Sequence, residues 1–120
     1  MEYRFETGTP ITEEQALAQI DELGFHALAF DEETPEDELL HWHEFDSVVF
    51  VISGTGRFAD EHGTVTEVAP GCRLQAPAGW LHRNLAGPSR RVVLGTDLPG
   101  DRWTSPINKD PADRPASPAG

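Results

Sequence analysis

The chain is 120 residues long, and 38% of its residues are hydrophobic, including three Trp and six Phe. A chain of this size can bury one hydrophobic core but is too short for two domains that each fold alone. Its 21 acidic residues outnumber nine basic ones, which gives a formal net charge of -12 at pH 7. Nucleic acids and anionic membranes are therefore not expected as partners, because both attract clustered Lys and Arg.

The start of the chain and its cysteine content predict a cytoplasmic protein. The first ten residues, MEYRFETGTP, contain neither the basic nor the apolar stretch of a secretory signal peptide. No apolar run approaches the roughly 20 residues that a membrane-spanning helix needs. Cys72 is the only cysteine, so an intramolecular disulfide is excluded and a reducing compartment is favoured.

The first of three expected regions, residues 1–24, combines a strand and a helix. The segment YRFE predicts an edge strand, through which two copies of the chain could pair into a homodimer. Thr12 and Gln15 have the spacing of a helix-capping pair, and Gly24 is a suitable helix end, so a helix is predicted from Thr12 to Gly24. The apolar face of this helix is predicted to consist of Leu17, Ile20 and Leu23.

The second region, residues 25–98, is predicted to be a barrel of short strands. A first strand begins near Phe25. The acidic segment Asp31–Asp46 then predicts a solvated loop, or alternatively a negative rim that keeps anionic ligands away from His41. Further strands, separated by turns rich in Gly and Pro, are predicted at Leu39–Ser53, Gly56–Asp60, Thr64–Val68, Arg73–Gln75, Leu81–Leu85 and Arg90–Thr96. Many short strands at this spacing favour an antiparallel sandwich or barrel.

The third region, residues 99–120, is predicted to be a C-terminal extension. Its last part, DPADRPASPAG, has almost nothing to bury, so disorder is expected from about residue 109 onward. Trp103 and Ile107 are expected to fold back onto the barrel.

A metal site is indicated by His41 and His43. Residues two apart in a strand point to the same face, so both imidazoles would enter one space. Imidazole binds several divalent metals, but a useful site needs a third ligand. The pair alone is also compatible with two histidines that are merely exposed or part of the core.

Two segments of the chain resemble the two motifs of the cupin superfamily, G(x)5HxH(x)3-4E(x)6G and G(x)5PxG(x)2H(x)3N. The first motif is matched by three residues: His41, His43 and Gly54. The second is matched by four: Gly71, Pro77, Gly79 and His82. The resemblance covers roughly residues 35–97. It implies an all-β fold, an antiparallel cupin-type β-barrel (double-stranded β-helix or jelly roll), with one divalent metal ion bound by the three histidines.

The sequence departs from the cupin motifs where a glutamate ligand usually stands. Ser47 occupies that position, and Pro35 and Ala86 replace the leading Gly and the closing Asn. By strand parity Ser47 points inward, whereas Glu44 and Asp46 point outward unless a bulge intervenes. Some cupin dioxygenases likewise use three histidines without a carboxylate. The alternative is a barrel that has lost metal binding, or that binds metal without catalysis.

The expected pocket and function follow from this resemblance. Side chains expected to line the pocket or support the metal are Phe45, Ser47, Phe58, Gln75, Trp80 and Asn84. The favoured function is that of a non-haem Fe(II) dioxygenase-like enzyme acting on a small-molecule substrate. A Zn, Ni or Mn enzyme with isomerase, lyase or cyclase activity is the alternative, as is a barrel that only binds a ligand or metal. A shared fold does not decide among these functions.

Overall fold

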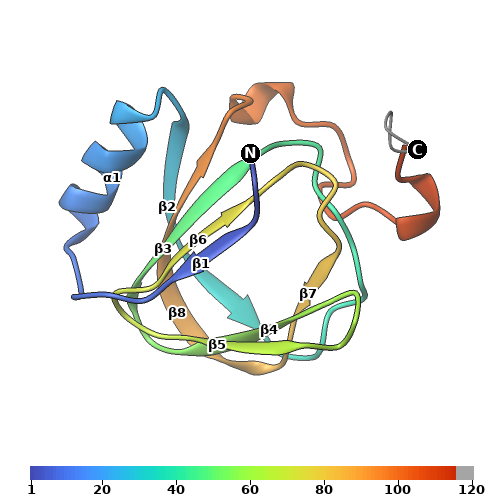
Figure 1. Cartoon of the computed structure of the whole chain (residues 1–120), viewed down its shortest axis with the longest axis horizontal. Helices are drawn as coiled ribbons and strands as arrows, with labels where there is room; N and C mark the ends of the chain where they lie inside the picture. Colours follow the sequence, from blue (N-terminus) through green and yellow to red (C-terminus); the bar gives the residue numbers. More distant parts are fainter. Residues whose placement is uncertain (116–120) are drawn as a thin grey trace.

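A computed structural model describes residues 1–115 of the chain. Two antiparallel sheets face each other (Figure 1), one with strand order β1-β6-β3-β8-β2 and one with order β5-β4-β7. The elements are β1 (Arg4–Glu6), α1 (Glu13–Glu22), β2 (His26–Thr34), β3 (Ser47–Ser53), β4 (Gly56–Asp60), β5 (Val65–Val68), β6 (Arg73–Ala76), β7 (His82–Asn84), β8 (Gly87–Thr96) and the 3-10 turns η1 (Gly100–Arg102) and η2 (Pro111–Asp113). The predicted all-β barrel with one N-terminal helix is confirmed.

Helix α1 begins where its capping pair predicts. The Thr12 side chain accepts a hydrogen bond from the Gln15 backbone, and the Gln15 side chain accepts one from the Thr12 backbone. The expected apolar face was wrong in part, because Leu23 is 47% exposed whereas Ala16 and Ile20 are fully buried. Residues four apart stack on one side of a helix, so Ala16 and Ile20 together form the contact with the large sheet.

Strand β3 is buried on both faces. Val48 and Phe50 pack against α1, which covers the outer side of the large sheet. Val51 lies in a second cluster, with Cys72 and Val92, on the side that faces the small sheet. This alternation explains why the strand reads as a continuous apolar run, and it fixes which residues face the interior of the barrel.

Two predicted boundaries in the acidic segment were wrong. β2 continues to Thr34 instead of giving way to a loop after Phe30, because Asp31 and Glu32 pair with Arg91 and Arg90 of β8. Opposite charges on neighbouring strands stabilise their pairing. The next strand begins at Ser47 rather than Leu39. Between β2 and β3 the backbone forms two isolated bridges, His41 to His82 and Trp42 to Lys109.

The expectation of disorder from residue 109 was wrong for residues 109–115. Lys109 and Trp42 exchange two backbone hydrogen bonds, and the Trp42 indole donates another to the Asp110 carbonyl at 2.8 Å. These bonds hold the segment without requiring it to bury apolar side chains. As expected, Trp103 folds back, and its ring stacks on Phe45 at 4.8 Å. Residues 116–120 lie outside the described part of the chain.

The expected homodimer stays a prediction. Strand β1 pairs with β6 of its own chain and lies at an edge of the large sheet, so its outer side has no partner strand within residues 1–115. Within the same residues, no helix is long and apolar enough to cross a membrane.

We expect Gly71→Ala to lower the free energy of unfolding by about 3 kcal/mol. Gly71 has a φ of +97°, and a Cβ there would lie 2.1 Å from the Gly8 carbonyl oxygen, which is backbone and cannot move aside as a side chain can. Gly63→Ala is the matched control, because Gly63 has a similar φ of +81° with no atom within 4 Å of its Cβ position. Gly63→Ala should lower the free energy of unfolding by only roughly 1–2 kcal/mol, the cost of a left-handed backbone conformation for a residue with a Cβ. Equal costs in urea unfolding would contradict the proposed clash.

Candidate metal centre

Three histidines lie close together at the cavity between the sheets. His41 and His82 exchange two backbone hydrogen bonds of 2.9 and 3.0 Å, and the His43 carbonyl accepts a bond from Gly79 at 2.9 Å. These bonds tie the segment before β3 to the turn before β7. One ring nitrogen from each histidine lies within 4.8 Å of the others. The three side chains could therefore bind one metal ion.

Hydrogen bonds fix which nitrogen of each imidazole is free. The Nδ1 atoms of His41, His43 and His82 lie 2.8, 2.9 and 3.0 Å from the carbonyl oxygens of Leu39, Ile107 and Trp80, respectively. A carbonyl can only accept, so each Nδ1 carries the proton and donates it. Each Nε2 is then left with a lone pair. Backbone carbonyls hold metal-binding histidines in this tautomer, so the donor set fits a divalent metal.

Burial keeps two of these imidazoles neutral. Desolvation lowers the pKa of His82 to about 3, with further lowering by the neighbouring histidines. Desolvation also lowers the pKa of His43 to about 4, although its bond to Ile107 acts in the opposite direction. Because a metal must compete with protons for the ring nitrogens, neutral histidines are ready to bind it at neutral pH.

We expect the metal-free protein to lose stability as the pH falls below 6.5. Between pH 6.5 and the lowered pKa values of His43 and His82, the unfolded chain binds more protons than the folded one. The free energy of unfolding therefore falls as the pH falls through this interval, and the full contribution is present above 6.5. Urea unfolding after metal removal measures it. His82→Gln removes one of the two groups and should give a shallower pH dependence, and an unchanged slope would contradict the assignment.

The carboxylates of Glu44 and Asp46 form hydrogen bonds with other parts of the chain. Asp46 accepts a hydrogen bond from the Ala78 backbone at 2.8 Å. Glu44 accepts bonds from Thr104 at 2.9 and 2.7 Å and lies 3.2 Å from the Lys109 ammonium. These bonds lower the pKa of Glu44, with the Thr104 hydroxyl contributing most. Ser47 lies on the cavity side instead. Within residues 1–115, the group that could hold a metal ion thus consists of three histidines without a carboxylate.

The histidines open onto a cavity of about 300 Å³. Aromatic rings flank them. Phe45 stacks on His43 with centroids 5.1 Å apart, and Trp80 stacks on His82 with centroids 4.5 Å apart. Of the side chains expected here, five line the cavity: Phe45, Ser47, Phe58, Trp80 and Asn84.

The expectation that Gln75 faces this cavity was wrong. Leu74 and Ala76 line the cavity, and since neighbouring residues of a strand face opposite sides, Gln75 points away. Its side-chain amide donates a hydrogen bond to the Glu2 carbonyl at 2.8 Å. Gln75 therefore helps to hold the N-terminal segment beside β6.

Comparison with solved structures identifies the architecture. A cupin 2 domain-containing protein from Halorhodospira halophila aligns with a TM-score of 0.51 and 20% identity over 87% of this chain and 70% of its own. A DUF861 family protein from Thermotoga maritima aligns with a TM-score of 0.57 and 16% identity over 79% of this chain and 99% of its own. The chain has the cupin fold.

A third similar structure is the polyketide cyclase RemF from Streptomyces resistomycificus. It aligns with this chain with a TM-score of 0.52 and 23% identity, over 72% of this chain and 64% of its own. At such identities the likeness shows the fold alone. Sequence comparison finds no matching family model and no matching curated protein.

Other residues that line the cavity were not predicted from the sequence. Arg90 lines the cavity with its side chain 2% exposed, and its Nη2 contacts Glu32 and lies 3.3 Å from the Thr34 hydroxyl. The spacing of Arg90, Val92 and Leu94 could have predicted that Arg90 faces the interior, since all three residues share the inner face of β8. The C-terminal segment also reaches the cavity, with three residues: Trp103, Ile107 and Asn108.

Proposed function

We propose that this cupin is a metal-dependent enzyme acting on a small molecule. The observation that carries the proposal is that one ring nitrogen from each of three histidines lies within 4.8 Å of the others, and that all three histidines line a cavity of about 300 Å³. Small-molecule sites have volumes from about 300 to 1,000 Å³ and are mostly apolar, with a few polar groups. The aromatic and aliphatic lining favours a substrate with a largely apolar or aromatic body and a chelating polar end.

The donor set supports chemistry in which substrate and metal are in direct contact. Because the three candidate ligands are histidines, they add no negative charge to a bound divalent ion, which would therefore be a strong Lewis acid. Fe(II) would also allow reaction with O₂. Phe45 and Trp80 would limit water around the ligands, and Ser47 would offer its hydroxyl on the cavity side. We favour Fe(II) and a dioxygenase-like reaction.

Non-oxidative chemistry with Zn, Ni or Mn is the second candidate. It is supported by the likeness to RemF, which is described as a polyketide cyclase. In such a reaction the three histidines would hold an ion that acts as a Lewis acid toward a substrate carbonyl, and no O₂ would be consumed. The two candidates therefore differ in a measurable co-substrate.

The test is oxygen uptake by protein reconstituted anaerobically with Fe(II). A panel of small chelating catechols, diketones and thiols is screened first for a ligand-dependent change in the electronic spectrum, and then for O₂ consumption. His82→Ala is run in parallel. We expect a spectral change and O₂ uptake in the wild type alone. Turnover without O₂ uptake would favour the cyclase-like candidate. Metal binding without any spectral change or turnover would leave a binding protein and defeat both enzymatic candidates.

A further inference from the structure

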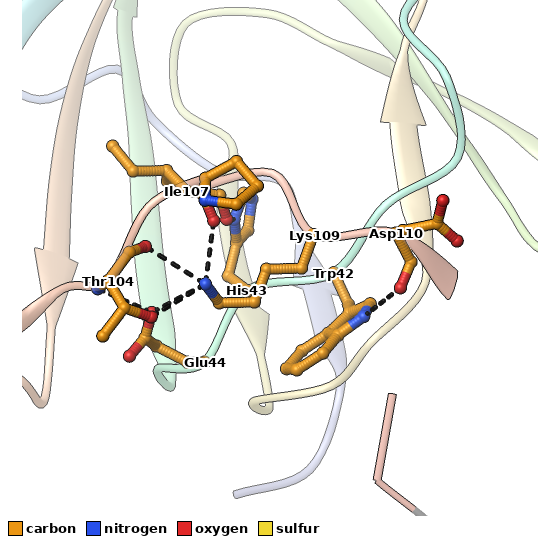
Figure 2. A network of polar contacts seen from close by, with 8 residues as sticks. Trp42, His43, Glu44, Thr104, Ile107, Lys109 and Asp110 are labelled. Carbon is orange, nitrogen blue, oxygen red and sulfur yellow. Dashed lines mark hydrogen bonds and ion pairs between the residues drawn. The ribbon is translucent and has the colours of Figure 1, made fainter. Parts of the chain in front are cut away.

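The C-terminal segment from Trp103 to Asp110, here called the strap, contacts three consecutive residues at the metal centre (Figure 2). The backbone of Trp42 pairs with that of Lys109, and the Ile107 carbonyl accepts the hydrogen bond from His43. Glu44 contacts Thr104 and the Lys109 ammonium. The candidate ligand His43 is therefore held together with both of its chain neighbours.

His43 differs from the other two histidines in what orients it. The Nδ1 atoms of His41 and His82 each bond to a carbonyl two residues earlier in their own segment. The Nδ1 partner of His43 lies 64 residues away, on the strap. If the strap moves, His43 alone loses the bond that fixes its tautomer and ring orientation.

Through its ammonium, Lys109 forms hydrogen bonds to two other residues of the strap, Thr104 and Pro106. Its ammonium lies 2.8 Å from the Pro106 carbonyl, 3.1 Å from the Thr104 carbonyl and 2.9 Å from the Thr104 hydroxyl. It also lies 3.2 Å from Glu44, and its side chain is only 13% exposed. The three donors of the ammonium are thus shared among four oxygens, three of which belong to the loop from Thr104 to Lys109. This loop carries the Ile107 carbonyl.

We propose that Lys109 is a positioning residue of the metal centre, which holds the strap so that the Ile107 carbonyl keeps His43 in its metal-binding tautomer. This inference rests on the metal site of the proposed function. The strap also bounds the substrate space, since Trp103 and Asn108 line the cavity. The geometry predicts that weakening the contacts of the Lys109 ammonium changes metal retention more than it changes the free energy of unfolding.

The test compares Lys109→Met with the wild type, Lys109→Arg and Arg102→Met. Lys109→Met keeps the aliphatic stem but removes the charge, whereas Arg102 is an exposed basic residue of η1 and serves as the control. Cobalt(II) is bound as the probe, and its release to a chelator is followed by its visible spectrum. We expect release from Lys109→Met to be about 10- to 100-fold faster, the usual effect of losing an outer-shell partner. Lys109→Arg should restore most of the retention, and the control should match the wild type.

A second measurement needs no metal. In metal-free protein, the Nδ1 proton of His43 should give an exchange-protected imidazole NMR signal because it is bonded to Ile107. This signal should disappear in Lys109→Met, while the signals of His41 and His82 remain. If Lys109→Met does not fold, Glu44→Gln weakens the contact between Glu44 and the Lys109 ammonium. It is expected to speed cobalt release and to weaken the His43 signal as well.

The outcomes separate the two proposals. Unchanged cobalt release and an unchanged His43 signal in Lys109→Met would overturn the positioning role, and so would a lost signal with unchanged release. If the wild type binds no cobalt and the His43 signal is still lost in Lys109→Met, the role of Lys109 in orienting His43 is supported. The proposed metal-dependent function is then contradicted instead.

Discussion

We expect His82→Ala to abolish metal binding while the barrel stays folded. Alanine keeps the backbone bridge between His82 and His41, so only the imidazole is lost. The two remaining histidines supply too few ligands, because structural and catalytic sites use three or more. Loss of an outer-shell partner lowers metal affinity by roughly 10- to 100-fold. Loss of the ligand His82 should lower the metal affinity by more than this. Elemental analysis of protein purified without chelators or affinity-tag nickel measures the change.

The matched control for this experiment is His62→Ala. His62 lies between β4 and β5 with its side chain 79% exposed, so its removal deletes an imidazole without touching the centre. Near-stoichiometric metal in the wild type and the control, lost in His82→Ala, is the expected result. Equal metal content in all three proteins would place the ion elsewhere. A wild type that takes up no metal after reconstitution would contradict the metal centre itself.

The strands and the first two histidines of the cluster could be predicted because both depend on short-range patterns. Gly71 and Gly79 have positive φ values at turns, and such turns divide the sequence into strands of nearly the right length. The spacing of His41 and His43 predicts two imidazoles on one face of extended backbone, and their rings do come together although this segment forms only isolated bridges. The third histidine could be assigned through the resemblance to the cupin motifs, since nothing in local spacing brings His82 to the other two.

The contacts that could not be predicted join distant parts of the chain. Composition predicted disorder near Lys109 because apolar burial was lacking there, but backbone pairing with Trp42 holds the segment instead. The acidic residues Asp31 and Glu32 belonged to a strand because their partners, two arginines, come about 60 positions later. A pattern read along the chain does not reveal which charge will lie opposite another.

We expect Glu32→Ala to lower the free energy of unfolding by about 3 kcal/mol, at the low end of the cost of leaving one partner of a buried ion pair uncompensated. Arg90 is its partner, with a side chain only 2% exposed, whereas that of Glu32 is 29% exposed. Nη1 of Arg90 has no hydrogen-bond partner within residues 1–115, and a Cβ at Gly56 would lie 2.9 Å from it. The guanidinium is therefore tightly enclosed, and Glu32 is the carboxylate that neutralises it.

Arg90→Met and the double variant decide whether the charge is the cause. Methionine removes the buried cation and fills much of the space, so Arg90→Met should cost less than Glu32→Ala. Once the cation is gone, Glu32→Ala should add little, because a partly exposed carboxylate can be replaced at small cost. Urea unfolding of the four proteins gives the coupling between the two residues. Additive losses would mean that Glu32 stabilises β2 through packing, and the ion pair would then make no separate contribution to the barrel.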